Sequence, residues 1–151
     1  MIALLQRVTR GKVRVKDSVV GEIGMGLVIL LGVFQDDTEK ESKILANKTE
    51  NLRIFNDADD KMNLSLLDVK GEALVISQFT LCADYKKGRR PNYLMAAEPK
   101  MAEELYSKYI VELQESGTNV QVGEFGAMMD VDLINSGPVT ITLDTEKFSR
   151  A

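Results

Sequence analysis

The chain has 151 residues, a formal net charge of -4 at pH 7 and no histidine. Its length predicts one domain with a sizeable hydrophobic core, and its mild negative charge means that any binding of nucleic acid would need a local basic patch. The absence of histidine excludes the Ser-His-Asp and Cys-His mechanisms, the HExxH metalloprotease site and histidine-ligated metals, so an enzyme of this composition must rely on hydroxyls, carboxylates, lysines, backbone groups or its own substrate.

The N-terminal part of the chain has the alternation of strands. Apolar and polar residues alternate over 2–8 and 12–23, and the polar triplet at 16–18 predicts a hairpin turn within the second stretch. The start of the chain lacks the basic region and cleavage site of a signal peptide, so we expect a cytoplasmic protein. The longest apolar run, at 26–34, has the length of a buried strand and is too short to cross a membrane.

Two segments have the pattern of amphipathic helices. Residues 36–52 begin with acidic residues and carry a rough apolar stripe, which predicts a helix with its N-cap among residues 36–38. Residues 98–117 have apolar side chains every four positions, with Pro99 at the start and Gly117 at the end. This second segment predicts a long helix that packs one face on the core.

The polar stretch 56–63, NDADDKMN, resembles a calcium-binding loop in composition only. It lacks the central glycine and the closing glutamate of such loops. We therefore expect a solvated loop. The single cysteine, Cys82, excludes an internal disulfide and a cysteine-based zinc site, and we predict no metal and no cofactor.

The remaining segments predict strands. One lies within 71–84, and three more follow at 119–125, 128–134 and 138–143. The order is strands, helix, strand, helix, strands, without a linker or a repeat. This order predicts a mixed α/β fold in one domain spanning 1–151, with mainly antiparallel pairing because most connections are short.

The stretch SQFTL at 77–81 directly follows an apolar run. In a continued strand, Ser77 and Phe79 would face one side and Gln78 and Thr80 the other. Spacing alone favours an ordinary strand end, whereas a functional interpretation places these polar groups at the mouth of a site. Without a histidine nothing obvious deprotonates Ser77 or Thr80, which argues against a covalent hydroxyl nucleophile.

Four cations follow within five residues, and we call the segment 85–92 the basic loop. It is either a solvated charged loop or an anion-binding loop, since arginine forks and lysine charges both suit phosphates. The residues alone favour neither interpretation strongly. The cations are Lys86, Lys87, Arg89 and Arg90.

The stretch NSGPVTI at 135–141 carries a Gly-Pro pair. Local chemistry favours a turn or a strand boundary, and Pro138 is expected at a strand start or at an edge because it lacks an N–H. The functional alternative is a backbone carbonyl that a cis Gly-Pro bond aims into a pocket, since an X-Pro bond becomes cis at little cost.

Taken in order, LLQRV, SQFTL, ADYKKGRRP, FGAMM and NSGPVTI closely resemble the D-aminoacyl-tRNA deacylases over essentially the whole chain. The resemblance implies a barrel-like sheet pair with two main helices, in the manner of the D-Tyr-tRNA deacylase fold. It implies hydrolysis of the ester between a D-amino acid and tRNA, and also of glycine mischarged on tRNA(Ala). It further implies a cofactor-free, tRNA-binding homodimer with its active site at the subunit interface and no association with membranes.

The resemblance also assigns roles to residues. One subunit would supply the catalytic strand, and its partner a Gly-cisPro motif whose carbonyls exclude an L side chain. The catalytic residues would be Ser77, Gln78, Phe79 and Thr80, and the motif Gly137 and Pro138. Support of the motif and the pocket would come from Arg7, Ala127, Met129 and Asn135. The basic loop would contact tRNA. Ser136 stands where the family commonly has aspartate.

An aminoacyl ester is already activated, so positioned water and oxyanion stabilisation could suffice for its hydrolysis. We expect backbone N–H groups near Phe79 and Thr80 to bind the oxyanion, with Ser77 and Gln78 fixing the terminal adenosine and the ester. The base would be the ribose hydroxyl of tRNA or an ordered water, and Thr80 as a nucleophile is the alternative. A nucleic-acid-binding module without catalysis and an oligomeric scaffold are the competing functions.

Overall fold

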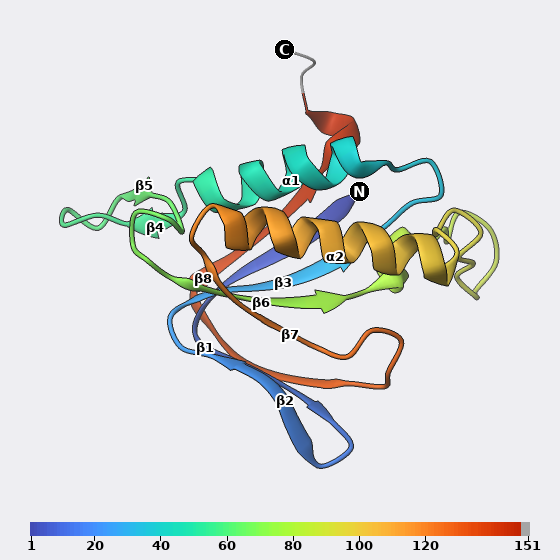
Figure 1. Cartoon of the computed structure of the whole chain (residues 1–151), viewed down its shortest axis with the longest axis horizontal. Coiled ribbons are helices and arrows are strands. Elements are labelled where there is room, and N and C mark those ends of the chain that lie inside the picture. Colours follow the sequence, from blue (N-terminus) through green and yellow to red (C-terminus); the bar gives the residue numbers. More distant parts are fainter. Residues whose placement is uncertain (149–151) are drawn as a thin grey trace.

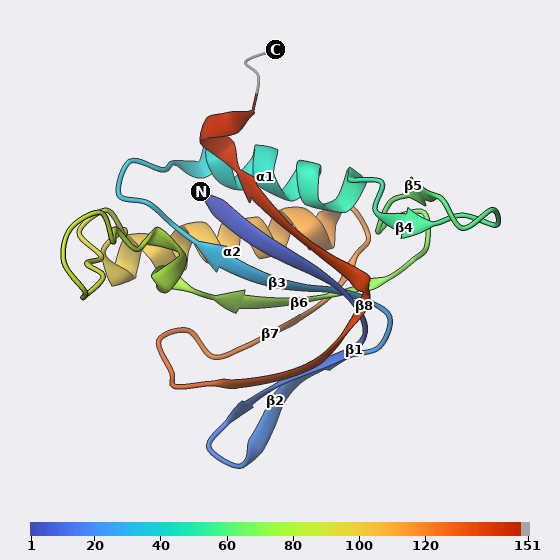
Figure 2. The ribbon, with the colours of Figure 1, turned by 180° about the vertical axis from the view of Figure 1, so that it is seen from behind.

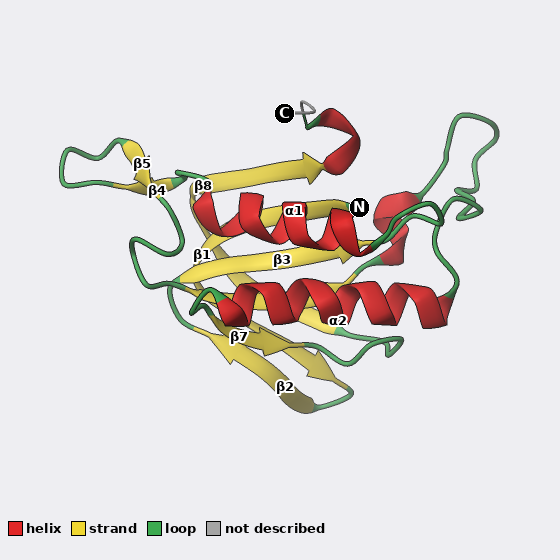
Figure 3. Ribbon diagram, turned by 45° about the horizontal axis from the view of Figure 1, so that its top comes forward, coloured by secondary structure: helices red, strands yellow, loops and turns green. Residues whose placement is uncertain are grey.

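The computed structural model describes residues 1–148 and has a mixed α/β fold, as the sequence predicted. Both main helices lie side by side over one face of a strongly curved sheet (Figures 1 and 3). The strands are β1 (Ile2–Val15), β2 (Ser18–Ile23), β3 (Gly26–Gly32), β4 (Phe55–Asn56), β5 (Met62–Leu64), β6 (Glu72–Ser77), β7 (Asn119–Val122) and β8 (Asp130–Asp144). The helices are α1 (Glu39–Asn51) and α2 (Pro99–Glu115), with short 3₁₀ helices η1 (Phe79–Cys82) and η2 (Thr145–Lys147).

The main sheet follows the order β2-β1-β3-β6-β7, and β8 pairs with β1. β1 is antiparallel to β2, β3 and β8, whereas β3–β6 and β6–β7 are parallel. α1 and α2 supply the crossovers that these parallel pairs require. The outer strands β2 and β7 approach each other at Gly21, where a Cβ atom would lie 2.6 Å from the Val122 carbonyl oxygen. The sheet is therefore nearly closed into a barrel.

Two long strands replace what the sequence predicted as shorter pieces. β1 runs unbroken through Thr9 and Arg10, which are exposed and interrupt the apolar alternation. β8 likewise continues through the Gly-Pro segment. Pairing explains both differences, since β8 follows β1 almost from end to end and keeps both backbones extended where the side-chain pattern is broken. The hairpin turn at 16–18 is confirmed by the pairing of Val15 with Ser18.

Both helix predictions are confirmed at their ends. Thr38 caps α1 in a capping box, accepting from the Lys40 N–H at 3.3 Å while Glu41 accepts from the Thr38 N–H at 2.8 Å. Pro99 occupies the first turn of α2, and Gly117 follows that helix with a φ of 100°, a value that glycine adopts at little cost.

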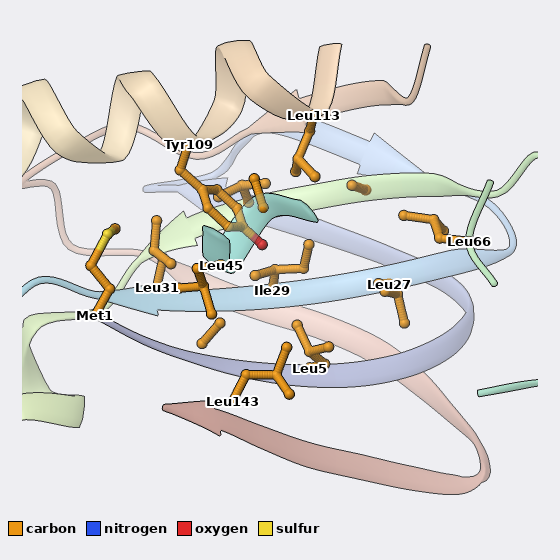
Figure 4. Close-up of a cluster of buried hydrophobic side chains, with 14 of the residues drawn as sticks. Met1, Leu5, Leu27, Ile29, Leu31, Leu45, Leu66, Tyr109, Leu113 and Leu143 are labelled. Atoms are coloured by element: carbon orange, nitrogen blue, oxygen red, sulfur yellow. The ribbon is translucent and has the colours of Figure 1, made fainter. Parts of the chain in front are cut away.

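The main core lies between the two helices and the sheet (Figure 4). The α2 stripe contributes Leu105, Tyr109 and Leu113, all buried. The hydroxyl of Tyr109, fully buried, donates to Thr49 Oγ1 at 2.8 Å and so ties α2 to α1. Burial raises the pKa of the Tyr109 phenol, which keeps it neutral and able to donate. No helix of the described residues is long and apolar enough to span a membrane.

The polar stretch 56–63 is not wholly a loop, because β4 and β5 form a short hairpin around it that projects from the sheet (Figure 1). Asp57 closes the hairpin, since its Oδ1 accepts from the Asp59 N–H at 2.9 Å and the Lys61 N–H at 3.1 Å. These hydrogen bonds lower the pKa of the Asp57 carboxyl. Local side-chain-to-backbone bonds of this kind set the turn that the composition alone left undefined.

Candidate active site

The SQFT stretch does not continue as a strand, so the predicted division of its side chains between two faces is wrong. β6 ends at Ser77, and the chain turns into η1 at Phe79. The turn is held because the Gln78 N–H donates to the Leu31 carbonyl at 2.8 Å and because Cys82, at the end of η1, is buried. Burial of Cys82, two residues beyond Thr80, therefore outweighs the strand propensity of the stretch.

The turn leaves two backbone donors at the start of η1 without partners. Within residues 1–148, neither the Phe79 N–H nor the Thr80 N–H donates a hydrogen bond, as expected for the first residues of a helix. The Gln78 side-chain amide donates to Thr80 Oγ1, which leaves the proton of that hydroxyl available to another acceptor. Together these groups form a small cluster of donors on an exposed surface.

A hollow of about 380 Å³ lies beside η1 and has the size of a small-ligand site. Burial, reinforced by the Asp37 charge, raises the pKa of the Cys82 thiol to about 11, so Cys82 is neutral and is not a nucleophile. Phe79, the first residue of η1, packs edge-to-face on Tyr93 with ring centroids 4.9 Å apart. The hollow is lined by Phe34, Cys82, Ala83, Asp84, Tyr85, Lys86 and Met95.

The basic loop borders this hollow. Its base is closed by two backbone hydrogen bonds between Asp84 and Asn92, of 2.8 and 2.9 Å. Its four cations are exposed, and none of them forms an ion pair with any residue of the described part of the chain. The loop therefore presents unneutralised positive charge next to η1.

The Gly-Pro segment protrudes from β8 instead of making a simple turn. Gln6 pairs with Thr140 and Val8 with Asn135, so β8 advances by five residues where β1 advances by two. The intervening residues bulge outward, with Gly137 at a φ of 116° and both Gly137 and Pro138 exposed. The Gly137–Pro138 bond is cis. Pro138 lies on an outer strand, where its missing N–H costs no sheet hydrogen bond.

Side chains hold this bulge at both ends. Arg7 Nε donates to the Ser136 carbonyl at 3.1 Å, and Asn135 Nδ2 donates to the carbonyls of Arg7 at 3.1 Å and Val139 at 2.9 Å. The Ser136 contact uses its backbone, so a serine in place of the family's usual aspartate leaves the Arg7 bond intact. Arg7 also reaches the β4–β5 hairpin through the Ile54 carbonyl at 2.9 Å, a contact that sequence reasoning missed.

Ala127 and Met129 lie in a different place, in the loop between β7 and β8. Met129 packs against the second hydrophobic cluster, which includes Ile76 near the end of β6. Met129 therefore packs near the SQFT end of β6 rather than beside Gly137 and Pro138, and Ala127 precedes it in the same loop.

The SQFT and Gly-Pro segments are far apart within one chain. Arg7 pairs with Leu27 of β3, and Ser77 pairs with Leu31 on the other side of the same strand. Four residues of strand span about 13 Å, and the two segments are further separated across the sheet. Figure 2 shows the bend of β8 near β4, whereas the yellow-green η1 lies at the opposite end of β6.

Comparison with known proteins found clear similarity over nearly the whole chain. A family model described as D-Tyr-tRNA(Tyr) deacylase matches residues 4–144. The D-aminoacyl-tRNA deacylase of Dehalococcoides mccartyi (strain CBDB1) is 54% identical over 145 residues, which are 96% of this chain and 95% of the relative. A solved structure titled c-Myc DNA Unwinding Element Binding Protein superposes with a TM-score of 0.91 at 38% identity, covering 95% of this chain and 98% of that one.

One relative shows that sequence identity alone does not establish catalytic activity. A protein of Bacillus subtilis (strain 168), named as an inactive D-aminoacyl-tRNA deacylase, is 56% identical over 130 residues, or 86% of this chain and 98% of the relative. Relatives of similar identity thus carry names with opposite implications for catalysis. Activity has to be argued from the residues of the site.

Proposed function

The chain belongs to the D-Tyr-tRNA(Tyr) deacylase family, and on this premise we propose that it hydrolyses the ester bond of D-aminoacyl-tRNA. The observation that carries the proposal is the pair of unpartnered N–H groups of Phe79 and Thr80 at the exposed start of η1, whose other end, at Cys82, lines a ligand-sized hollow. Two such donors stabilise the oxyanion that forms when water attacks an ester carbonyl. This chemistry needs no histidine, metal or cofactor.

The tRNA supplies the remaining parts of the mechanism. The terminal nucleoside and the ester bind at the start of η1, where Ser77 and Gln78 fix them. The 2′-hydroxyl of its ribose, or an ordered water, accepts the proton of the attacking water. Thr80 orients the site through its bond with Gln78 and is not acylated. The basic loop binds phosphates near the 3′ end through charge alone, without reading sequence.

Stereochemical selection comes from the Gly-Pro bulge of a second copy. The bulge is exposed and lies well away from the SQFT segment of its own chain, so it can act on an ester only in another subunit. Its backbone forms a wall at the α-carbon that an L side chain strikes, while a D side chain points to solvent. A wall of this kind acts on all L substrates alike and accepts glycine, including glycine mischarged on tRNA(Ala).

The deciding experiment incubates the purified protein with D-Tyr-tRNA, L-Tyr-tRNA and Gly-tRNA(Ala). We expect fast release of D-tyrosine and glycine, with L-tyrosine retained on its tRNA. Equal hydrolysis of the D and L esters would disprove the stereochemical filter. No hydrolysis of any substrate would disprove the enzymatic function and leave a binding or scaffold role.

DNA binding is the second candidate, because of the likeness to the structure titled c-Myc DNA Unwinding Element Binding Protein. The net charge of -4 makes broad affinity for DNA unfavourable, and the basic loop is the local exception. Retention of labelled duplex DNA at physiological salt, together with no ester hydrolysis, would favour this function over the deacylase.

A further inference from the structure

The guanidinium of Arg7 joins two separate parts of the molecule. On one side its Nε donates to the Ser136 carbonyl, beside the Gly-Pro bulge, at 3.1 Å. On the other side its Nη1 donates to the Ile54 carbonyl at 2.9 Å and to Asn56 Oδ1 at 3.1 Å. The Arg7 side chain thus links the β4–β5 hairpin to the bulge.

The position of this guanidinium also fixes Gly137. A Cβ atom on Gly137 would lie only 2.5 Å from Arg7 Nη2, so the guanidinium lies directly against the Gly137 backbone. A planar guanidinium keeps one orientation when several acceptors hold it, and it pivots more easily as acceptors are lost. If Arg7 pivots, the bulge that rests on it moves.

Asn56 limits that movement as a second acceptor for Nη1 beside the Ile54 carbonyl, and its position is fixed because the hairpin that carries it is closed on both sides. Arg53 Nε donates to the Asn63 carbonyl at 2.7 Å, across the base of the hairpin. The Asp57 N–H donates to the Lys61 carbonyl at 2.8 Å, across its tip. Asn56 lies between these closures and is the only side chain of the hairpin, among the described residues, that accepts from Arg7.

We propose that Asn56 is a positioning residue for stereochemical selection, acting through Arg7 on Gly137 and Pro138. The β4–β5 hairpin then serves as an outer brace for the bulge, in addition to the contacts that β1 provides. The inference rests on the proposed function, since it concerns discrimination between D and L esters.

The test compares Asn56→Ala with the unmodified protein on D-Tyr-tRNA and L-Tyr-tRNA. We expect the ratio of D to L hydrolysis to fall about tenfold, the effect of losing one hydrogen bond to a charged group. The KM for D-Tyr-tRNA should stay unchanged, because the basic loop lies at the other end of the sheet. Asn56→Asp keeps a side chain of the same length with an oxygen acceptor, and it should restore the ratio of D to L hydrolysis.

Two further variants separate this role from a general loosening of the hairpin. Asn63→Ala removes the side-chain partner of Arg53 in the same hairpin without touching Arg7, and we expect it to keep the ratio. Asn56→Leu keeps side-chain volume without an acceptor and should behave as Asn56→Ala. An unchanged ratio in Asn56→Ala, or an equal fall in Asn63→Ala, would overturn the inference. An unmodified protein inactive on both esters would instead overturn the proposed function.

Discussion

Among single residues, the proposed site uses backbone groups and side chains that hold the backbone. Phe79 and Thr80 contribute N–H groups, and Arg7 and Asn135 hold the ends of the Gly-Pro bulge. This arrangement agrees with a chain that has no histidine and whose only thiol is buried and neutral. Substitutions of Thr80 and of Gly137 distinguish the proposed mechanism from its alternatives.

Thr80→Val removes the hydroxyl that would attack the ester if Thr80 were a nucleophile. We expect the kcat for D-Tyr-tRNA to fall by no more than about tenfold, because the variant loses only the acceptor for the Gln78 amide. Loss of a true nucleophile costs several orders of magnitude. Thr80→Ser serves as the control that keeps the hydroxyl, and a single-turnover assay of both variants makes the distinction.

Gly137→Ala should damage selectivity. The residue has a φ of 116°, and a Cβ atom would overlap Arg7 Nη2 at 2.5 Å, so the bulge and Arg7 must separate. We expect the ratio of D to L hydrolysis to fall by more than about tenfold. Gly117→Ala, at a φ of 100° with no atom within 4 Å, has the same backbone cost without the overlap. Its ratio should not change, and an equal loss there would refute the explanation.

Among the elements, the two helices pack on each other and on the sheet around the main core. α1 and α2 meet near their C-terminal ends, where Ser116 Oγ donates to the carboxylate of Glu50. Burial, partly offset by this hydrogen bond and assisted by the nearby Glu112 charge, raises the pKa of Glu50 above its ordinary value of 4.5. This contact therefore links the stability of the helix pair to pH.

The direction in which pH changes the stability of the folded chain through Glu50 is testable. Because the folded state holds the Glu50 proton more tightly than the unfolded chain does, stability due to Glu50 is lost as pH rises above 4.5. Glu50→Gln keeps an acceptor for Ser116 and has no proton to lose. Its Tm relative to the unmodified protein should therefore increase from pH 4.5 to neutral pH. Glu115→Gln, an exposed change on α2, is the control, and a Tm difference independent of pH would contradict the assignment.

The basic loop is the element proposed to bind tRNA. Replacing its four cations by glutamine should raise the KM for D-Tyr-tRNA severalfold with little change in kcat. The salt dependence of binding should weaken by about one unit of slope for each phosphate that the loop no longer neutralises. The charge-matched control replaces four exposed lysines elsewhere, namely Lys40, Lys48, Lys61 and Lys70. An unchanged KM in the loop variant, or an equal rise in the control, would refute the role of the loop.

For the whole molecule, the separation of the SQFT and Gly-Pro segments means that the proposed stereochemical selection requires a second chain. Exposed apolar side chains near the site, including Phe79, Leu94 and Met128, are suited to contact with a second copy. A homodimer would bring the bulge of each subunit to the SQFT segment of the other.

Mixed dimers test this assembly directly. Gln78→Ala should be inactive with an intact bulge, and Gly137→Ala should be active but unselective. In a hybrid dimer of the two variants, the SQFT segment of the Gly137→Ala subunit is active and receives the intact bulge of the Gln78→Ala subunit. Adding an excess of the Gln78→Ala protein should therefore suppress the hydrolysis of L-Tyr-tRNA by the Gly137→Ala protein. If each bulge served its own chain, mixing would leave L hydrolysis unchanged. Sedimentation of the unmodified protein provides an independent measure of the dimer.

The helices, the class of fold and the residue types available for chemistry could be predicted from local sequence patterns. Apolar periodicity with Pro99 and Gly117 placed the ends of α2, and it limited the N-cap of α1 to residues 36–38, of which the structure shows Thr38. Caps and periodicity are local properties of the chain. The absence of histidine narrowed the chemistry without any structure.

The contacts between segments that are distant in the sequence depend on the tertiary structure. The turn from β6 into η1 depends on burial of Cys82, and the continuity of β8 through Pro138 depends on its pairing with β1. The hydrogen bond between Arg7 and Asn56 joins residues 49 positions apart. Such interactions are set by long-range packing, which local patterns do not encode, so only the folded chain reveals the brace behind the Gly-Pro bulge.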